Sequence, residues 1–325
     1  MASPDPWAPL AEILLGKAAL TPAEVAREAG LGPEATRRLW RALGFPPVAD
    51  DERLFTRADV DVLRAVGALV AMQSAHPDDV VQLTRVIGQS LARIADAQVT
   101  ATADRIDGMR GDAPFDDGAR QDVVRRIELL LPSLERFLSY VWRRHLLAAV
   151  RRRDAAPSGG GQTLVVGFAD LVGFTGLSQA IAPGELTQIV DRFEALAYEH
   201  IVERGGRVAK MIGDEVMFAA HDAGSAAEIA LALADAYARE SDLPGVRVAL
   251  ARGPTLSWEG DLYGPTVNLA SRLVNLAREN TVLVSEDLGG ELHGDPRFET
   301  RHLRPVSLRG IGRARMWVLR RARRR

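Results

Sequence analysis

Two aspartates stand where predicted strands end, a position that suits metal-dependent chemistry at phosphorus. The buried strand predicted over 163–170, TLVVGFAD, ends in Asp170, and Asp214 occupies the turn of a hairpin predicted over 207–220. Carboxylates, waters and phosphate oxygens are the ligands that Mg²⁺ prefers, and paired divalent ions recur in displacements at phosphorus. A strand cap or a solvated turn explains each residue taken alone. Both hypotheses stay open on these residues.

Groups that suit a nucleotide follow in two other segments. After the first strand, LVGFTGLS offers backbone amides to phosphate oxygens, as a helix N-terminus does: the residues are Phe174, Thr175, Gly176 and Leu177. Asn268 and Arg272 lie four residues apart in a helix predicted over 264–280, so they share one face. Asparagine suits a sugar or phosphate contact, and the guanidinium fork suits developing phosphoryl charge. An amphipathic helix with an unspecialised polar face is the alternative.

Lysine is rare in this chain, which makes one lysine informative. Of the 41 basic residues, only Lys17 and Lys210 are lysine. An ammonium and a guanidinium are not interchangeable at a tight site. Lys210 at the head of KMIGDEVMF therefore favours a specific contact.

The chain changes character at 151–162, RRRDAAPSGGGQ, which has the composition of a flexible linker. Helical periodicity dominates residues 1–150, and strands alternate with helices over 163–325. The second half is predicted to be α+β or α/β, with helices on one face of its sheet. The C-terminal segments RPVSLRGI and MWVLRR are predicted to complete that sheet.

Three motifs in order, FADLVGFTGLS, KMIGDEVMF and DLYGPTVNLASRL, resemble the class III nucleotidyl cyclase catalytic domain, over residues 162 to about 320. The resemblance implies a ferredoxin-like domain, a mixed sheet flanked by helices, after an all-α regulatory domain. It also implies roles for seven side chains: Asp170 and Asp214 as metal ligands, Lys210 and Asp261 as readers of adenine, Asn268 as the ribose contact, Arg272 as the transition-state arginine and Arg309 as a triphosphate contact.

The reaction that this resemblance implies is conversion of ATP to 3′,5′-cyclic AMP and pyrophosphate, with two Mg²⁺ or Mn²⁺ ions per site. A lysine donor and an aspartate acceptor match N1 and N6 of adenine, whereas both would be mispaired against guanine, so GTP is disfavoured. Since the family's site lies between two domains and all six principal residues are in one chain, the resemblance implies a homodimer with two composite sites.

The stretch 20–66 has a helix-turn-helix rhythm and resembles the DNA-binding fold of MerR-type regulators. Arg37, Arg38 and Arg41 are placed to reach phosphates, but neighbouring acidic residues dilute the basic face. We therefore expect a regulatory domain of the bacterial, actinobacterial type and not a DNA-binding one. A small molecule or protonation, with His145 as the candidate group, are the regulatory signals considered.

Apolar residues at spacings of four and three mark a helix seam in the same half: Val123, Ile127, Leu130, Leu134, Phe137 and Val141. The seam is either internal to a bundle or a dimer-forming signalling helix. Pro132 lies within it and is predicted to start a new helix, with Ser133 near the cap.

Composition excludes several classes of protein. With no cysteine, thiolate metal sites and cysteine nucleophiles are absent, and a net charge of −2 argues against wholesale nucleic-acid binding. No apolar run is long enough for a bilayer span and no signal peptide is recognised, so a cytoplasmic protein is expected. The alternatives to an active cyclase are a silent scaffold of the same fold, a DNA-binding regulator and, less well matched, a guanylate or diguanylate cyclase.

Overall fold

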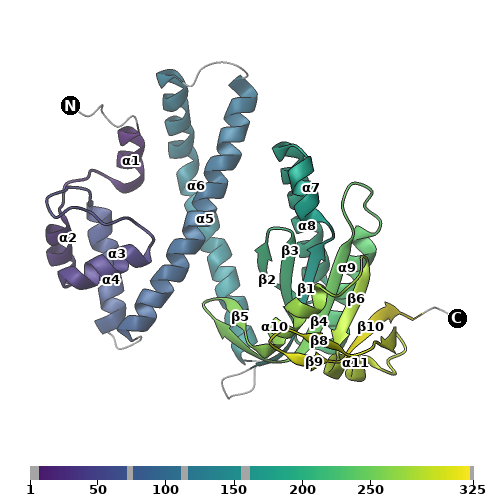
Figure 1. Cartoon of the computed structure of the whole chain (residues 1–325). Helices are drawn as coiled ribbons and strands as arrows, with labels where there is room; N and C mark the ends of the chain where they lie inside the picture. Colours follow the sequence, from purple (N-terminus) through teal and green to yellow (C-terminus); the bar gives the residue numbers. More distant parts are fainter. Residues whose placement is uncertain (1–6, 72–75, 111–115, 155–161, 323–325) are drawn as a thin grey trace. The chain divides into compact units, whose positions relative to one another are not determined.

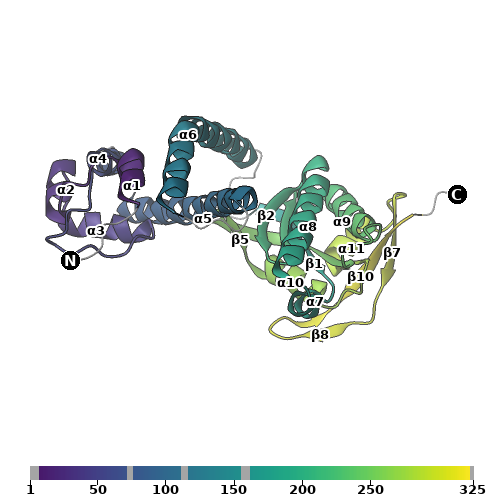
Figure 2. The same ribbon diagram turned by 90° about the horizontal axis from the view of Figure 1, so that it is seen from above.

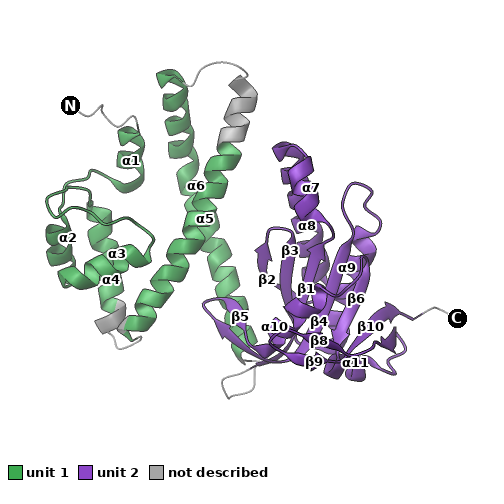
Figure 3. Ribbon diagram, in the orientation of Figure 1, with its two compact units in different colours: residues 1–154 green, residues 155–325 purple. Residues whose placement is uncertain are grey.

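The computed structural model describes residues 7–71, 76–110, 116–154 and 162–322 (Figure 1). The chain divides into two compact units, residues 1–154 and residues 155–325 (Figure 3). The predicted linker falls mainly on 155–161, outside the described residues, while 151–154 continue a helix.

Helices make up most of the described part of unit 1, and an isolated β-bridge joins Leu20 to Phe55. The helices of this unit are α1 (Ala8–Leu15), α2 (Pro22–Ala29), α3 (Pro33–Ala42), α4 (Arg57–Ala71), α5 (Pro77–Arg110) and α6 (Asp117–Asp154). Local chemistry sets the start and end of α2. Thr21 and Glu24 form a reciprocal capping box at its start, and Gly30 ends it at φ 73°. A small core that includes Val25, Leu39 and Phe55 joins α2, α3 and α4.

The predicted break at Pro132 is wrong, because α6 runs through it. A proline removes one backbone hydrogen bond, and this 38-residue helix keeps the bonds on either side. The seam along α6 is buried at Val123 but left open further on, where Leu130 is 61% and Phe137 62% exposed. Unit 1 therefore does not cover this seam by itself.

Unit 2 is built on an eight-stranded mixed sheet (Figure 2). The order is β2-β3-β1-β4-β6-β10-β7, with β5 paired to β4, and only β4 and β6 run parallel. The strands are β1 (Gln162–Leu171), β2 (Arg207–Ile212), β3 (Glu215–Ala220), β4 (Val246–Trp258), β5 (Asp261–Tyr263), β6 (Thr281–Ser285), β7 (Phe298–His302) and β10 (Met316–Arg321). The helices are α7 (Phe174–Ala180), α8 (Pro183–Glu203), α9 (Ala223–Tyr237), α10 (Pro265–Val274) and α11 (Glu286–Leu292).

Helices lie on both faces of the sheet, which corrects the prediction of one covered face. Odd-numbered β1 residues such as Val165 and Ala169 pack with α8, α9 and α11, while Val166 and Phe168 pack with α10. Each face of β1 is therefore buried, which explains its uninterrupted apolar sequence.

The C-terminal segments divide differently from the prediction. MWVLRR forms β10 inside the sheet, as expected, but RPVSLRGI does not join it. Instead β8 (Val306–Leu308) and β9 (Gly312–Ala314) pair only with each other, and β7, which was not predicted, takes the sheet edge. The hairpin leaves the sheet because Leu308 and Ala314 are buried against the α10 side.

Gly167 is a packing constraint on the strand that carries Asp170. It faces Phe218 across the β1–β3 ladder, and an added Cβ would lie 2.2–2.6 Å from three atoms of that fully buried ring. We expect Gly167→Ala to destabilise the protein by about 1–3 kcal/mol through overpacking. Urea denaturation followed by circular dichroism measures this. Gly290→Ala, at an open position on α11, is the control and should not destabilise; equal midpoints for the two variants would contradict the assignment.

Candidate active site

The two predicted metal ligands lie at neighbouring strand ends. Asp170 is the penultimate residue of β1 and is 7% exposed, while Asp214 sits in the β2–β3 turn after Gly213, whose φ is 62°. The backbone amide of Leu171 donates to the carbonyl of Asp214 at 3.0 Å. This bond fixes the turn against the end of β1, so the structure brings both carboxyl groups to one edge of the sheet.

Arg247 is a functional candidate that the sequence reasoning missed. It lies directly opposite Asp170 in the β1–β4 ladder, and its Nε donates to Asp170 Oδ2 at 2.5 Å. Burial raises the pKa of Asp170, Arg247 opposes that rise, and the nearby Asp214 adds to it. The sequence VRVALARG predicts a strand that contains Arg247. It does not specify that this strand pairs with β1, and that pairing places Arg247 opposite Asp170.

Glu215 adds a third carboxyl to this group. It is the register partner of Asp170 on β3, and burial, together with the charges of Asp170 and Asp214, raises its pKa to about 7. The carboxyls of Asp170 and Asp214 are hard-oxygen donors of the kind that Mg²⁺ and Mn²⁺ take, and each raises the pKa of Glu215. The residues therefore fit the predicted metal.

Lys210 and Asp261 also meet, although 51 residues separate them. Lys210 follows a bulge in β2, and its Nζ forms an ion pair with Asp261 Oδ2 of β5. The other oxygen, Oδ1, accepts a bond from the amide of Leu262 at 2.8 Å. The lysine side chain is 43% exposed and the aspartate 19%, so the pair is open to a ligand on the lysine side.

A third group gathers along α10. Gly264, at φ 128°, precedes the helix, and Asn268 and Arg272 project from one face of it. They line a cavity of about 290 Å³ together with Arg309 from the turn between β8 and β9; Ser271, Gly310 and Ile311 complete the lining. The sequence gave no signal for these last three. The lining includes neither Asp170 nor Asp214.

The predicted phosphate-binding amides are reduced from four to two. Helix α7 begins at Phe174 after Gly173, which has φ 75°. The amides of Gly176 and Leu177 both donate to the carbonyl of Gly173 at 3.1 Å, because the segment closes a full helical turn. Those of Phe174 and Thr175 remain the candidates. His145 belongs to unit 1, where it lies exposed on α6.

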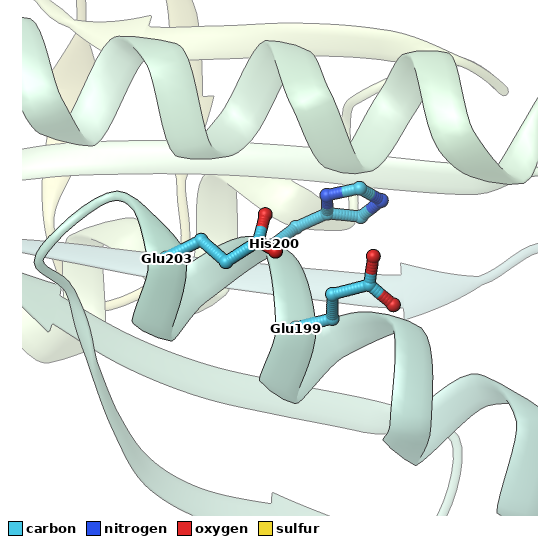
Figure 4. A group of neighbouring side chains, drawn as sticks. All are labelled: Glu199, His200 and Glu203. Carbon is cyan, nitrogen blue, oxygen red and sulfur yellow. The ribbon is translucent and has the colours of Figure 1, made fainter.

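A separate cluster on α8 resembles a metal site, but an arginine already bonds to two of its three residues. Glu199, His200 and Glu203 place ligand atoms within 4.8 Å of one another (Figure 4). Arg204 bonds to His200 Nδ1 at 3.2 Å and to Glu203 Oε2 at 3.4 Å. Burial and this guanidinium lower the pKa of His200. Arg204 therefore competes with a metal ion for His200 and Glu203.

Comparison with known proteins identifies the chain as a nucleotidyl cyclase, the class that its three motifs predict. Residues 160–321 match the adenylate and guanylate cyclase catalytic domain, and residues 9–145 match the adenylate cyclase regulatory domain. The adenylate cyclase of Streptomyces coelicolor is 41% identical over 276 residues, covering 84% of this chain and 71% of that protein. The adenylate cyclase of Glutamicibacter nicotianae is 37% identical, covering 89% of this chain and 75% of that protein. The chain belongs to the adenylate cyclase family.

Among solved structures, the adenylyl cyclase CyaB from P. aeruginosa is similar at 20% identity and a TM-score of 0.42, covering 50% of this chain and 95% of that one. The catalytic core of a rhodopsin-guanylyl cyclase is similar at 20% identity and a TM-score of 0.47, covering 50% and 97%. None of the helices in the described part of the chain combines the length and apolarity of a membrane span.

The raised pKa of Glu215 predicts a pH-dependent stability. The folded state holds this proton more tightly than the unfolded state, whose carboxyl titrates near 4.5, so stability falls as pH rises from about 4.5 to about 7. In a metal chelator, we expect Glu215→Gln to be more stable than wild type at pH 8 by about 1–2 kcal/mol, after allowance for solvent screening, and the gain to shrink at pH 5. Urea denaturation at both pH values tests this. Glu299→Gln, an exposed site on β7, is the control; a gain independent of pH would contradict the prediction.

Proposed function

We propose that the protein converts ATP to 3′,5′-cyclic AMP and pyrophosphate. The observation that carries the proposal is that one catalytic unit holds an acidic group at Asp170 and Asp214, a Lys210–Asp261 pair, and a cavity lined by Asn268, Arg272 and Arg309. The acidic group suits metal ions, the Lys210–Asp261 pair suits the hydrogen-bonding edge of a base, and the cavity with its arginines suits the phosphates of a nucleoside triphosphate.

The chemistry assigned to each group follows from its type. Asp170 and Asp214 would hold two Mg²⁺ or Mn²⁺ ions, which supply Lewis-acid activation of the 3′-hydroxyl and neutralise the triphosphate. Arg272 presents a fork to the charge that develops at the α-phosphorus, and Asn268 orients the ribose. Arg309 contacts the triphosphate. None of these site residues is an obvious general base, so positioning and charge stabilisation are assigned the acceleration.

Base selection is assigned to the Lys210–Asp261 pair. Without ATP, the ammonium of Lys210 and the carboxylate of Asp261 form an ion pair with each other. Neither group is therefore left without a partner in the free enzyme. Adenine offers an acceptor at N1 to Lys210 and a donor at N6 to Asp261. Guanine has the opposite polarity at both positions, which leaves the two side chains mispaired.

We propose a homodimer in which each site combines groups from two chains. The cavity beside Arg272 has basic and amide groups but no carboxylate among its lining, and a partner chain would supply the acidic group. Exposed apolar side chains accompany the Lys210–Asp261 pair on β2, β4 and β5: Ile212, Leu256, Trp258 and Tyr263, each 45–52% exposed. In unit 1, the open seam on α6 favours the dimer-forming alternative.

Unit 1 is proposed to regulate the catalytic unit and not to bind DNA. Arg37 and Arg41 pair with Glu34, and Arg38 pairs with Asp78, so all three predicted phosphate contacts are engaged. A cavity of about 610 Å³, whose walls include Trp40 and Phe55, is the candidate for a small-molecule signal; His145 remains the candidate for protonation.

Complementation tests the composite site. Asp214→Ala and Arg272→Ala should each abolish cyclic AMP formation from Mg²⁺- or Mn²⁺-ATP, because each removes one half of both sites. Mixed after unfolding and refolding together, the two variants should recover about a quarter of wild-type activity, since half of the dimers are mixed and each carries one intact site. Either variant refolded alone is the control. No recovery in verified mixed dimers would place the site within one chain.

The base-reading pair makes a separate prediction. Asp261→Ala should lower the ratio of kcat/KM for ATP to that for GTP by roughly tenfold to a hundredfold, corresponding to about 1–3 kcal/mol for a lost buried polar contact. Cyclic nucleotide formation from each triphosphate measures it. Asp287→Ala, at an exposed position on α11, should leave the ratio unchanged. An unchanged ratio in Asp261→Ala would remove this pair from base selection.

A further inference from the structure

The hairpin that presents Arg309 leaves the sheet between two strands that remain paired. It follows β7 and precedes β10, and His302 and Trp317 are direct partners in the ladder between them. The next bond, from the amide of Leu303 to the carbonyl of Met316 at 3.0 Å, is the last before the strands diverge. His302 and Trp317 therefore form the root of the Arg309 hairpin.

Trp317 is held from two sides. On one side lies Gly289 of α11, where an added Cβ would approach the indole ring within 2.1–2.5 Å. On the other side lies the imidazole of His302, with ring centroids 3.5 Å apart and planes inclined by 31°. Only 9% of Trp317 is exposed. A movement of the hairpin root that displaces Trp317 would change its packing against Gly289 or His302.

Glu286 closes the arrangement. It is the first residue of α11, and its Oε2 lies 3.8 Å from His302 Nδ1. Among the described residues, Glu286 Oε2 and Trp317 Nε1 are the buried side-chain atoms without a hydrogen-bond partner. A protonated His302 would bring a positive charge and a donor to the carboxylate and a cation to the face of the indole.

Other charged groups around this root are already engaged. Arg321, on the same face of β10 as Trp317, bonds to Glu228 and Asp235 of α9. His293, at the end of α11, lies 5.4 Å from the Trp317 ring and bonds to Thr300 Oγ1 at 2.9 Å. Two further acids belong to α11: Asp287, which is exposed, and Glu291, which is held by Arg252. Glu286 is thus the acid that faces His302.

We propose that His302, Trp317 and Glu286 form a clamp that positions the Arg309 hairpin, and that protonation of His302 tightens it. The residues act through Arg309 and are positioning residues, so the inference rests on the proposed contact between Arg309 and the triphosphate. Stronger contacts at the root reduce the range of positions that Arg309 can take in the cavity that it lines with Asn268 and Arg272. The effect falls on ATP binding more than on the chemical step.

Two substitutions at His302 in the full-length protein separate stacking from protonation. His302→Ala removes both and should raise KM for ATP about threefold to tenfold at every pH, the range expected for one aromatic pair. His302→Phe keeps a stacked ring that cannot be protonated. It should match wild type at a pH where the imidazole is neutral, but should lack the fall in KM for ATP that we expect of wild type on acidification. Indole fluorescence should show a pH-dependent quenching step in wild type that His302→Phe lacks.

A double-mutant cycle tests the route through Arg309. If the clamp acts by placing Arg309, His302→Ala should add little to the KM of Arg309→Ala. Arg301→Gln, the neighbouring residue on the opposite face of β7, is the matched control and should leave KM unchanged. The clamp would be overturned if the effects of His302→Ala and Arg309→Ala on KM were fully additive in the double variant. It would also be overturned if His302→Phe kept the wild-type pH dependence of KM. A wild-type KM in Arg309→Ala would instead overturn the proposed triphosphate contact.

Discussion

The catalytic unit depends on keeping the Asp170 carboxyl at the end of a buried strand. Burial raises the pKa of this group, and Arg247, fixed opposite it by the β1–β4 register, opposes the rise. Glu215 and Asp214 arrive from the β2–β3 hairpin and add negative charge at the same edge. The result is a group of carboxyls near one guanidinium. A bound divalent cation would further reduce the repulsion between these carboxyls. Register therefore determines the electrostatics of the proposed metal site.

The two faces of the sheet serve different purposes. The helices α8, α9 and α11 bury one face in a large apolar core, which keeps β1 in place. On the other face, α10 and the β8–β9 hairpin bring Arg272 and Arg309 to one cavity. Helix α11 connects the two functions, because Gly289 and Glu286 hold the root from which that hairpin leaves the sheet.

The apolar surfaces that each unit leaves open agree with a chain that works as a pair. On α6, side chains such as Phe137 and Trp142 are 62% and 60% exposed, and exposed apolar patches on folded proteins mark interaction sites. On unit 2, Trp258 lies at the end of β4, next to the β5 strand that holds Asp261. In the proposed homodimer, a second copy would cover these surfaces, since every copy presents the same ones.

The sequence by itself determined the features that are local. The class of enzyme followed from three motifs, the shared face of Asn268 and Arg272 from helical spacing, and the hairpin at Asp214 from turn chemistry. Only the tertiary structure decided which distant groups meet: Arg247 with Asp170, Arg309 with the α10 cavity, and Trp317 with Gly289 and His302. It also placed helices on both faces of the sheet. The physical reason is that spacing along the chain sets local hydrogen bonds, whereas strand register and sheet order are set by packing between residues far apart in the chain.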